Sequence, residues 1–245
     1  MKTLFLTIAL LTLTTASVFA QEFRIDSSVR YTKTIEPNRL DTSDSVSGKT
    51  GLDRRFFGDF NARVEYLLEP SFSPTLGLRI YKMPGDTSFV LEAKRVSNYQ
   101  EVNEQLRKEF PLIGISINDI SSISQEESNR IMAHNRDMMA KTFAERLKRY
   151  AIEVKSTPIH DSLANKLYDK ATKLLRAALP VGKSPYTIFD GETATFRCVV
   201  NDNELWTLRY HVPEGEYKAL SDLFRQMIAD VEAGCFEEGK YIQSL

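Results

Sequence analysis

The sequence has few of the residues that most metal and catalytic sites use, with two cysteines, three histidines and one tryptophan among 245 residues. Two cysteines exclude a disulfide-rich scaffold, although one disulfide between Cys198 and Cys235 is geometrically conceivable. No two histidines have the spacing of helical zinc ligands, and neither a Gly-x-Ser-x-Gly nor a phosphate-binding loop motif occurs. We therefore expect no metal site and no cofactor.

An excess of either charge is also lacking. The chain has 32 basic and 33 acidic residues, a formal net charge of −1, and no long block in which one sign dominates. Nothing in this pattern indicates nucleic acid or an anionic membrane as a partner. Outside the N-terminus no apolar run approaches the roughly 20 residues that a membrane-spanning helix needs.

The N-terminus has the pattern of a secretory signal peptide. A lysine at position 2 precedes the apolar run Leu4 to Leu13, and Val18-Phe19-Ala20 places small residues at the minus-three and minus-one positions of a cleavage site. We expect residues 1–20 to be removed after Ala20, which predicts a periplasmic or secreted protein.

The remaining chain divides by composition. Residues 21–58 are rich in Ser, Thr, Asp and Arg without a sustained period, which predicts an extended arm or linker. Residues 59–245 are expected to form a single α+β domain. Its first strands are expected at 62–68, 78–83 and 88–96, where short runs of branched and aromatic residues are separated by Pro and Gly.

Helix signals dominate the middle of the chain. Asn98 with Glu101 predicts an N-cap and a helix that ends at Pro111, and the run 112–117 is either a buried strand or an apolar loop. Ser124 with Glu127 forms a capping box that opens a long helix to about residue 151. Its apolar stripe is formed by Met132, Met139, Phe143, Leu147 and Tyr150, with Arg136 as an anomaly inside it.

A short strand at 152–155 precedes a second long helix, which we expect Asp161 to cap. Its inner face carries Leu163, Leu167, Ala171, Leu174 and Ala178. A last helix, with apolar residues from Tyr217 to Val231 in helical register, is expected to end at Gly234 and to cover a sheet. The whole is an antiparallel sheet of hairpins, each followed by a helix, with two long central helices.

The hairpin at 193–212 allows a register to be derived. A three-residue loop at 201–203 makes Val200 face Glu204, so that Cys198 opposes Trp206 and Arg197 opposes Thr207. One face is then apolar, whereas a four-residue loop would pair apolar with polar residues throughout. The other face collects Thr195, Arg197, Arg209 and His211.

Two interpretations of that polar face remain open. Antiparallel sheets commonly have one solvated face, which requires no function. Alternatively, two Arg side chains beside a His could hold a carboxylate, sulfate or sugar acid, because a guanidinium binds such groups through two parallel hydrogen bonds. Thr195, Arg197, Arg209 and His211 are therefore the candidate ligand-binding residues, and no residue qualifies as catalytic.

A weak internal echo links LRIYK, FVLEAKRV and the helix after them to FRCVV, LWTLRYHV and the last helix; duplication and chance both explain it. The strings VEYLLEPSFSP, LRIYK, FVLEAKRVSNYQEVN, FDGETATFRCVV and LWTLRYHVP resemble uncharacterised secreted proteins of Bacteroidetes-type bacteria. This resemblance covers the chain from about Asn61 and implies an extracytoplasmic location and a single unit, but it implies no activity.

The sequence therefore favours a non-catalytic periplasmic or secreted binding or interaction protein, with a small anionic ligand or an envelope protein as its partner. The alternative is a hydrolase whose site is assembled around the hairpin at 193–212.

Overall fold

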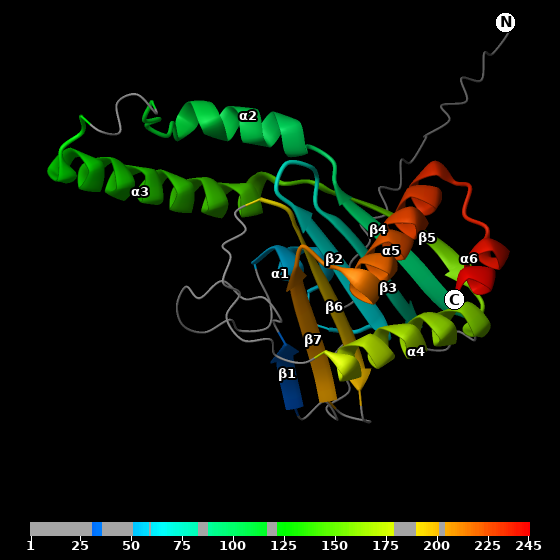
Figure 1. Ribbon diagram of the computed structural model, residues 1–245. Coiled ribbons are helices and arrows are strands. Elements are labelled where there is room, and N and C mark those ends of the chain that lie inside the picture. Colours follow the sequence, from blue (N-terminus) through cyan, green and yellow to red (C-terminus); the bar gives the residue numbers. More distant parts are fainter. Residues whose placement is uncertain are drawn as a thin grey trace, which may run out of the picture.

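A computed structural model describes residues 31–35, 51–58, 60–82, 88–116, 122–178, 190–200 and 204–245. The expected signal peptide and the hairpin loop at 201–203 lie outside these residues. Within them the chain forms six helices and one seven-stranded sheet, an α+β architecture as predicted (Figure 1). The elements are β1 (Tyr31–Ile35), α1 (Gly51–Phe57), β2 (Val64–Pro70), β3 (Leu76–Lys82), β4 (Phe89–Val96), α2 (Tyr99–Glu109), α3 (Gln125–Arg149), β5 (Ile152–Ile159), α4 (Asp161–Ala177), β6 (Glu192–Val200), β7 (Glu204–His211), α5 (Gly215–Ala233) and α6 (Glu238–Ser244).

The strands are ordered β1-β7-β6-β2-β3-β4-β5. β2 to β7 pair antiparallel, and β1 joins the edge parallel to β7. The three expected early strands are confirmed with shifts of one or two residues, and β5 continues past residue 155 to Ile159. Residues 112–116 form an exposed irregular segment, so the strand interpretation of that run was wrong.

One face of the sheet carries the larger hydrophobic core. Alternate residues of β2, namely Val64, Tyr66 and Leu68, are fully buried in this core. Residues of α4, α5 and α6 complete it, and α4 and α5 lie across the sheet (Figure 1). Each such burial contributes roughly 1.5–3 kcal/mol. The predicted inner face of α4 is buried, although His160, not Asp161, is its N-cap residue. Gly234 ends α5 with φ 70°, a left-handed conformation that suits glycine.

The opposite face is covered by α1 and α2. Leu52, Phe56 and Phe57 of α1 pack with Val102 and Leu106 of α2 in a second apolar cluster. The expected linker at 21–58 therefore contains two elements of the fold, since β1 lies in the sheet and α1 in a core. A helix of seven residues is too short for its apolar residues to repeat at helical spacing, so the sequence pattern does not reveal it within a polar segment.

A glycine permits the close approach of α1. A Cβ atom built at Gly77 on β3 would lie 2.6 Å from Phe56 Cδ1 and 2.8 Å from Phe57 Cζ, closer than carbon atoms can pack. The two aromatic rings therefore rest directly on the β3 backbone.

α2 and α3 form a helical arm that projects beyond the sheet (Figure 1). The capping box is confirmed at its first half, because Ser124 Oγ accepts a hydrogen bond from Glu127 N at 3.1 Å. Asn98 does not cap α2 through its side chain. Its amide instead donates to Arg149 O at 3.0 Å and accepts from Ala151 N at 2.8 Å, which ties the base of the arm together.

The internal echo does not correspond to a structural repeat. Leu78 and Phe196, which align in the two strings, face the same core. The helices that follow the two hairpins nevertheless cover opposite faces, α2 with the α1 cluster and α5 with the larger core. A duplicated unit would place its helix on the same side of equivalent strand residues.

Candidate functional site

The register of the β6–β7 hairpin is as derived from the sequence. Cys198 pairs with Trp206, Phe196 with Leu208 and Ala194 with Tyr210 on the core face. Arg197 pairs with Thr207, Thr195 with Arg209 and Thr193 with His211 on the polar face. Period-two alternation was sufficient to fix this arrangement.

The polar face is neither solvated nor open to an anion around Arg197. The Arg197 side chain is 2% exposed and forms ion pairs with Asp53 Oδ2 at 2.6 Å and Glu65 Oε2 at 3.0 Å. Asp53 comes from α1, which covers this part of the hairpin, and Glu65 lies opposite Arg197 on β2. Thr195 is buried as well. Arg197 and Thr195 are therefore buried parts of the fold. At these two positions the face is neither solvated nor open to a ligand, which corrects both interpretations made from the sequence.

Further ion pairs continue across this face of the sheet. Glu92 on β4 binds Arg79 Nε at 2.6 Å and Lys94 Nζ at 2.9 Å, and Lys94 also donates to Phe56 O at 2.6 Å. Burial lowers the pKa of Lys94, and Glu92 partly opposes that shift. The cluster contains three carboxylates and three cations: Asp53, Glu65, Glu92, Arg79, Lys94 and Arg197. This balance leaves no net positive charge to attract an anion.

Arg209 and His211 lie nearer the surface, at the end of β7. Arg209 Nη2 is 3.4 Å from Glu69 Oε2, and its side chain is 29% exposed. Burial raises the pKa of Glu69, with Arg209 acting against it. His211 Nδ1 is 3.1 Å from Thr193 Oγ1. The structure thus separates the four candidate residues into a buried pair and a partly exposed pair.

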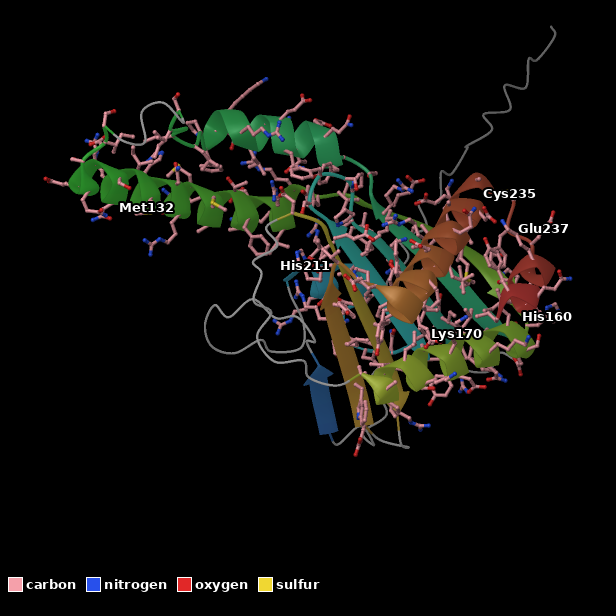
Figure 2. The ribbon with its side chains drawn as sticks, in the orientation of Figure 1. Met132, His160, Lys170, His211, Cys235 and Glu237 are labelled. Carbon is pink, nitrogen blue, oxygen red and sulfur yellow. The ribbon has the colours of Figure 1, made fainter. Side chains whose placement is uncertain are left out.

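The cysteines are free thiols. Cys198 is completely buried in the main core, and burial raises the pKa of its thiol. Cys235 is exposed just after α5 (Figure 2). The disulfide between Cys198 and Cys235 that the sequence allowed is therefore absent, because one thiol lies in the core and the other is exposed to solvent. In the described parts of the chain, no three His, Cys, Asp or Glu side chains are grouped as a metal would require.

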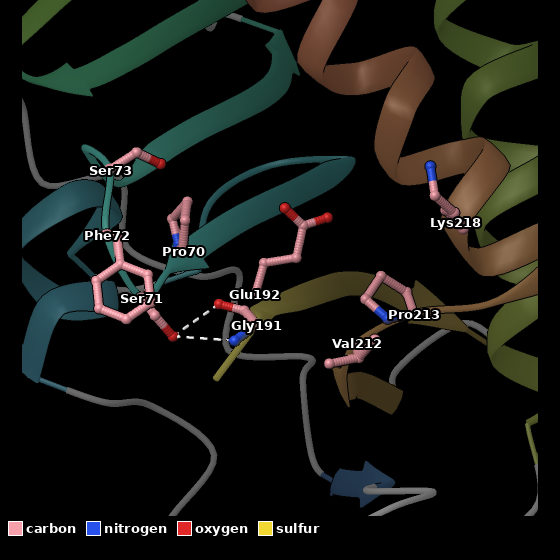
Figure 3. Close-up of a pocket in the computed structure, with 9 residues that line it drawn as sticks. All are labelled: Pro70, Ser71, Phe72, Ser73, Gly191, Glu192, Val212, Pro213 and Lys218. Atoms are coloured by element: carbon pink, nitrogen blue, oxygen red, sulfur yellow. Dashed lines mark hydrogen bonds between the residues drawn. The ribbon is translucent and has the colours of Figure 1, made fainter. Parts of the chain in front are cut away.

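A pocket of about 440 Å³ lies where three strand ends meet the start of α5 (Figure 3). Its lining is Pro70, Ser71, Phe72, Ser73, Gly191, Glu192, Val212, Pro213 and Lys218. Ser71 Oγ donates to Gly191 O at 2.8 Å and accepts from Gly191 N at 3.2 Å, which joins the turn after β2 to the start of β6.

The backbone at this pocket is strained. Val212 has φ 52°, a left-handed conformation that costs a branched residue on the order of 1–3 kcal/mol. Gly191 lies against it, since an added Cβ would be 2.6 Å from Val212 Cγ2. Such strain persists where surrounding structure enforces it, and it concentrates at functional sites.

A second unusual surface is the helical arm. Most of the large apolar side chains that are exposed in the described residues belong to α3 or to the segment that follows α2: Leu112, Ile113, Ile115, Met132, Met139 and Phe143. Met132 lies on the part of α3 remote from the sheet (Figure 2). The predicted apolar stripe is thus exposed along most of its length, whereas at its base Leu147 is half-buried and Tyr150 is buried. Arg136 is exposed with the stripe, and its presence was the sequence signal for this outcome.

Comparison with protein-family models, with curated proteins and with solved structures found no match to this chain. Among the described helices, none combines the length and apolar character needed to cross a membrane.

Proposed function

We propose that this chain is a non-catalytic periplasmic or secreted interaction protein whose arm, α2 and α3, docks on an acidic amphipathic helix of a partner protein. The observation that carries this proposal is the exposed apolar stripe on a helix that extends from the body of the fold. Met139 is 61% and Phe143 53% exposed. Exposed apolar patches of this kind mark interaction sites in soluble proteins.

The stripe has helical continuity. Met132, Arg136, Met139 and Phe143 recur at intervals of four, three and four residues, which places them along one side of α3. A partner helix that presents apolar residues at the same intervals would fit against it, as in other helix-in-groove complexes. Methionine side chains adapt readily to such surfaces.

The charge of the stripe favours an acidic partner. Arg136 lies within it, whereas the acids of α3 are all more than a quarter turn from the centre of the stripe around the helix axis at 100° per residue. These acids are Glu126, Glu127, Asp137 and Glu145, and ion pairs with Arg130, Lys141 and Lys148 engage the last three. A second copy of the chain would bring like charges together, so a partner with carboxylates is favoured.

The arm is held in place before any partner binds. Arg149 at the end of α3 forms two hydrogen bonds of 2.7 Å with the Glu109 carboxylate of α2. Asn135 donates to Ile113 O at 2.9 Å and accepts from Ile113 N at 2.8 Å, so the connecting segment is fixed to α3. A preorganised surface loses less conformational entropy on binding.

The hydrolase alternative has less support. Its proposed residues were Arg197, Arg209 and His211, and the first of these is buried in ion pairs. Cys198, the cysteine of the same hairpin, is buried on the other face, and burial raises the pKa of its thiol. The extracytoplasmic location itself rests on the N-terminal sequence pattern and on the resemblance to secreted proteins.

Two synthetic helical peptides test the proposal. They share an apolar face of leucines and differ only in a polar face of Glu or of Lys, and their binding to residues 21–245 is followed by fluorescence anisotropy. We expect the acidic peptide to bind more tightly, and Arg136→Glu to reverse the preference. Met139→Glu should weaken both peptides by about tenfold or more, because it places a charge in the apolar contact.

Arg130→Glu is the matched control. Arg130 is nine residues from Met139, half a turn around the helix, and its side chain is 77% exposed. It should leave both affinities unchanged. Equal binding of the two peptides, binding of neither, or an equal effect of Arg130→Glu would each contradict the proposal.

A further inference from the structure

We propose that the pocket at the ends of β2, β6 and β7 binds an uncharged sugar ring. This site shares no residue with the arm, and the inference does not depend on the docking function. The argument combines the shape and lining of the pocket, the hydrogen-bonding capacity that its side chains retain, and the balance of their charges.

The walls of the pocket are apolar. Phe72, at the turn after β2, is 77% exposed and is the most exposed large apolar side chain in the described residues. Pro70, Val212 and Pro213 line the remainder of the pocket (Figure 3). A sugar ring has one face of C–H groups, which packs against an aromatic ring, while its hydroxyl groups point outward from its edge.

Polar groups at the pocket keep hydrogen-bonding capacity. Glu192 uses Oε2 for an ion pair with Arg225, and within the described residues nothing bonds to Oε1. Lys218 gives one N–H to Asp222 Oδ2 at 2.5 Å, which leaves two donors. A sugar hydroxyl both donates and accepts, so neighbouring hydroxyl groups can satisfy the carboxylate oxygen and the ammonium group together.

The charges at the pocket favour a neutral ligand. Glu192 is already neutralised by Arg225, and Lys218 by Asp222. A ligand ammonium would compete with Arg225, and a ligand carboxylate with Asp222. An uncharged polyol uses the remaining lone pair and N–H groups while leaving both ion pairs intact.

The position of the walls is fixed. Val212 N donates to Glu192 O at 2.7 Å, so the strained residue is held against the strand that carries the carboxylate. Ser71 joins the turn that carries Phe72 to Gly191 through two hydrogen bonds. The backbone that carries Phe72, Glu192 and Val212 is therefore held in place, which reduces the entropy lost when a rigid ring binds.

Saccharide titrations test the inference. The probes are glucose, galactose, N-acetylglucosamine and their short oligomers, with glucosamine and glucuronate as charged counterparts. Saturation-transfer NMR detects binding to residues 21–245, and calorimetry gives the affinity. We expect saturable binding of at least one neutral sugar, and weaker binding of the cationic and anionic forms of a comparable ring.

Phe72→Ala should weaken that binding by about tenfold or more, because it removes the stacking surface. Phe72 is highly exposed, so this variant should fold like the wild type. Lys218→Met removes the donors while keeping the side-chain length and should also weaken binding. Val154→Ala, at an exposed apolar residue on β5, is the matched control. The proposal is overturned if no neutral sugar binds, if a charged sugar binds best, or if Phe72→Ala binds like the wild type.

Discussion

Replacing Arg197 should destabilise the fold far more than replacing its neighbour Arg209. In Arg197→Met, Asp53 and Glu65 would lose the cation that lies 2.6 and 3.0 Å from them, and both carboxylates are at most 2% exposed. Removing one partner of a buried ion pair costs about 3–5 kcal/mol. That is a large part of the roughly 5–15 kcal/mol by which a domain is stable.

Urea unfolding at neutral pH measures this loss, with an unchanged slope as evidence that the unfolded state is the same. Arg209→Met should cost less than about 1 kcal/mol, since that pair is 3.4 Å apart and partly exposed. Equal losses for the two variants would refute the assignment of Arg197 to a buried cluster.

Three further predictions follow from local geometry. Gly77→Ala should lower the unfolding free energy by about 1–3 kcal/mol, measured by denaturation, because its Cβ would overlap the phenylalanine rings of α1. Glu238 raises the pKa of His160 through a 2.7 Å contact. The stability that this contact adds to the folded state is therefore fully present below about pH 6.5 and is lost as the pH rises. The difference in melting temperature between wild type and Glu238→Gln should therefore decrease from about pH 6 towards pH 9. Cys235 should react with a thiol reagent in the native protein and Cys198 only after unfolding, whereas a disulfide would leave both unreactive.

The sequence predicted the parts of this fold that depend on local period. The hairpin register followed from alternation between Ala194 and Val200, and α5 followed from its apolar spacing and from Gly234. Alternation did not reveal what covers the polar face. A polar strand face buried by distant acids has the same pattern as a solvated one, and Asp53 is 144 residues from Arg197 in sequence.

The candidate surfaces were harder to predict for two different reasons. The stripe on α3 has the period of a core helix, and periodicity cannot distinguish a core from a docking surface. The pocket combines Phe72, Glu192, Val212 and Lys218 from four separate segments, and no motif connects them. Only the anomalous Arg136 carried a signal in the sequence.

The order of strands has a consequence for how the chain folds. At the centre of the sheet β2 pairs with β6, so the hydrogen bonds of residues 64–70 to this strand form only once residues 192–198 are present. The parallel addition of β1 to β7 spans a similar separation. Chains with such distant pairings fold slowly, on the scale of milliseconds to seconds, because loop closure precedes the stabilising contacts. A nascent chain that ends before β6 can pair β2 with β3 but would expose the other edge of β2, which β6 covers in the finished sheet. The last fifth of the sequence is therefore the part that completes the centre of the sheet.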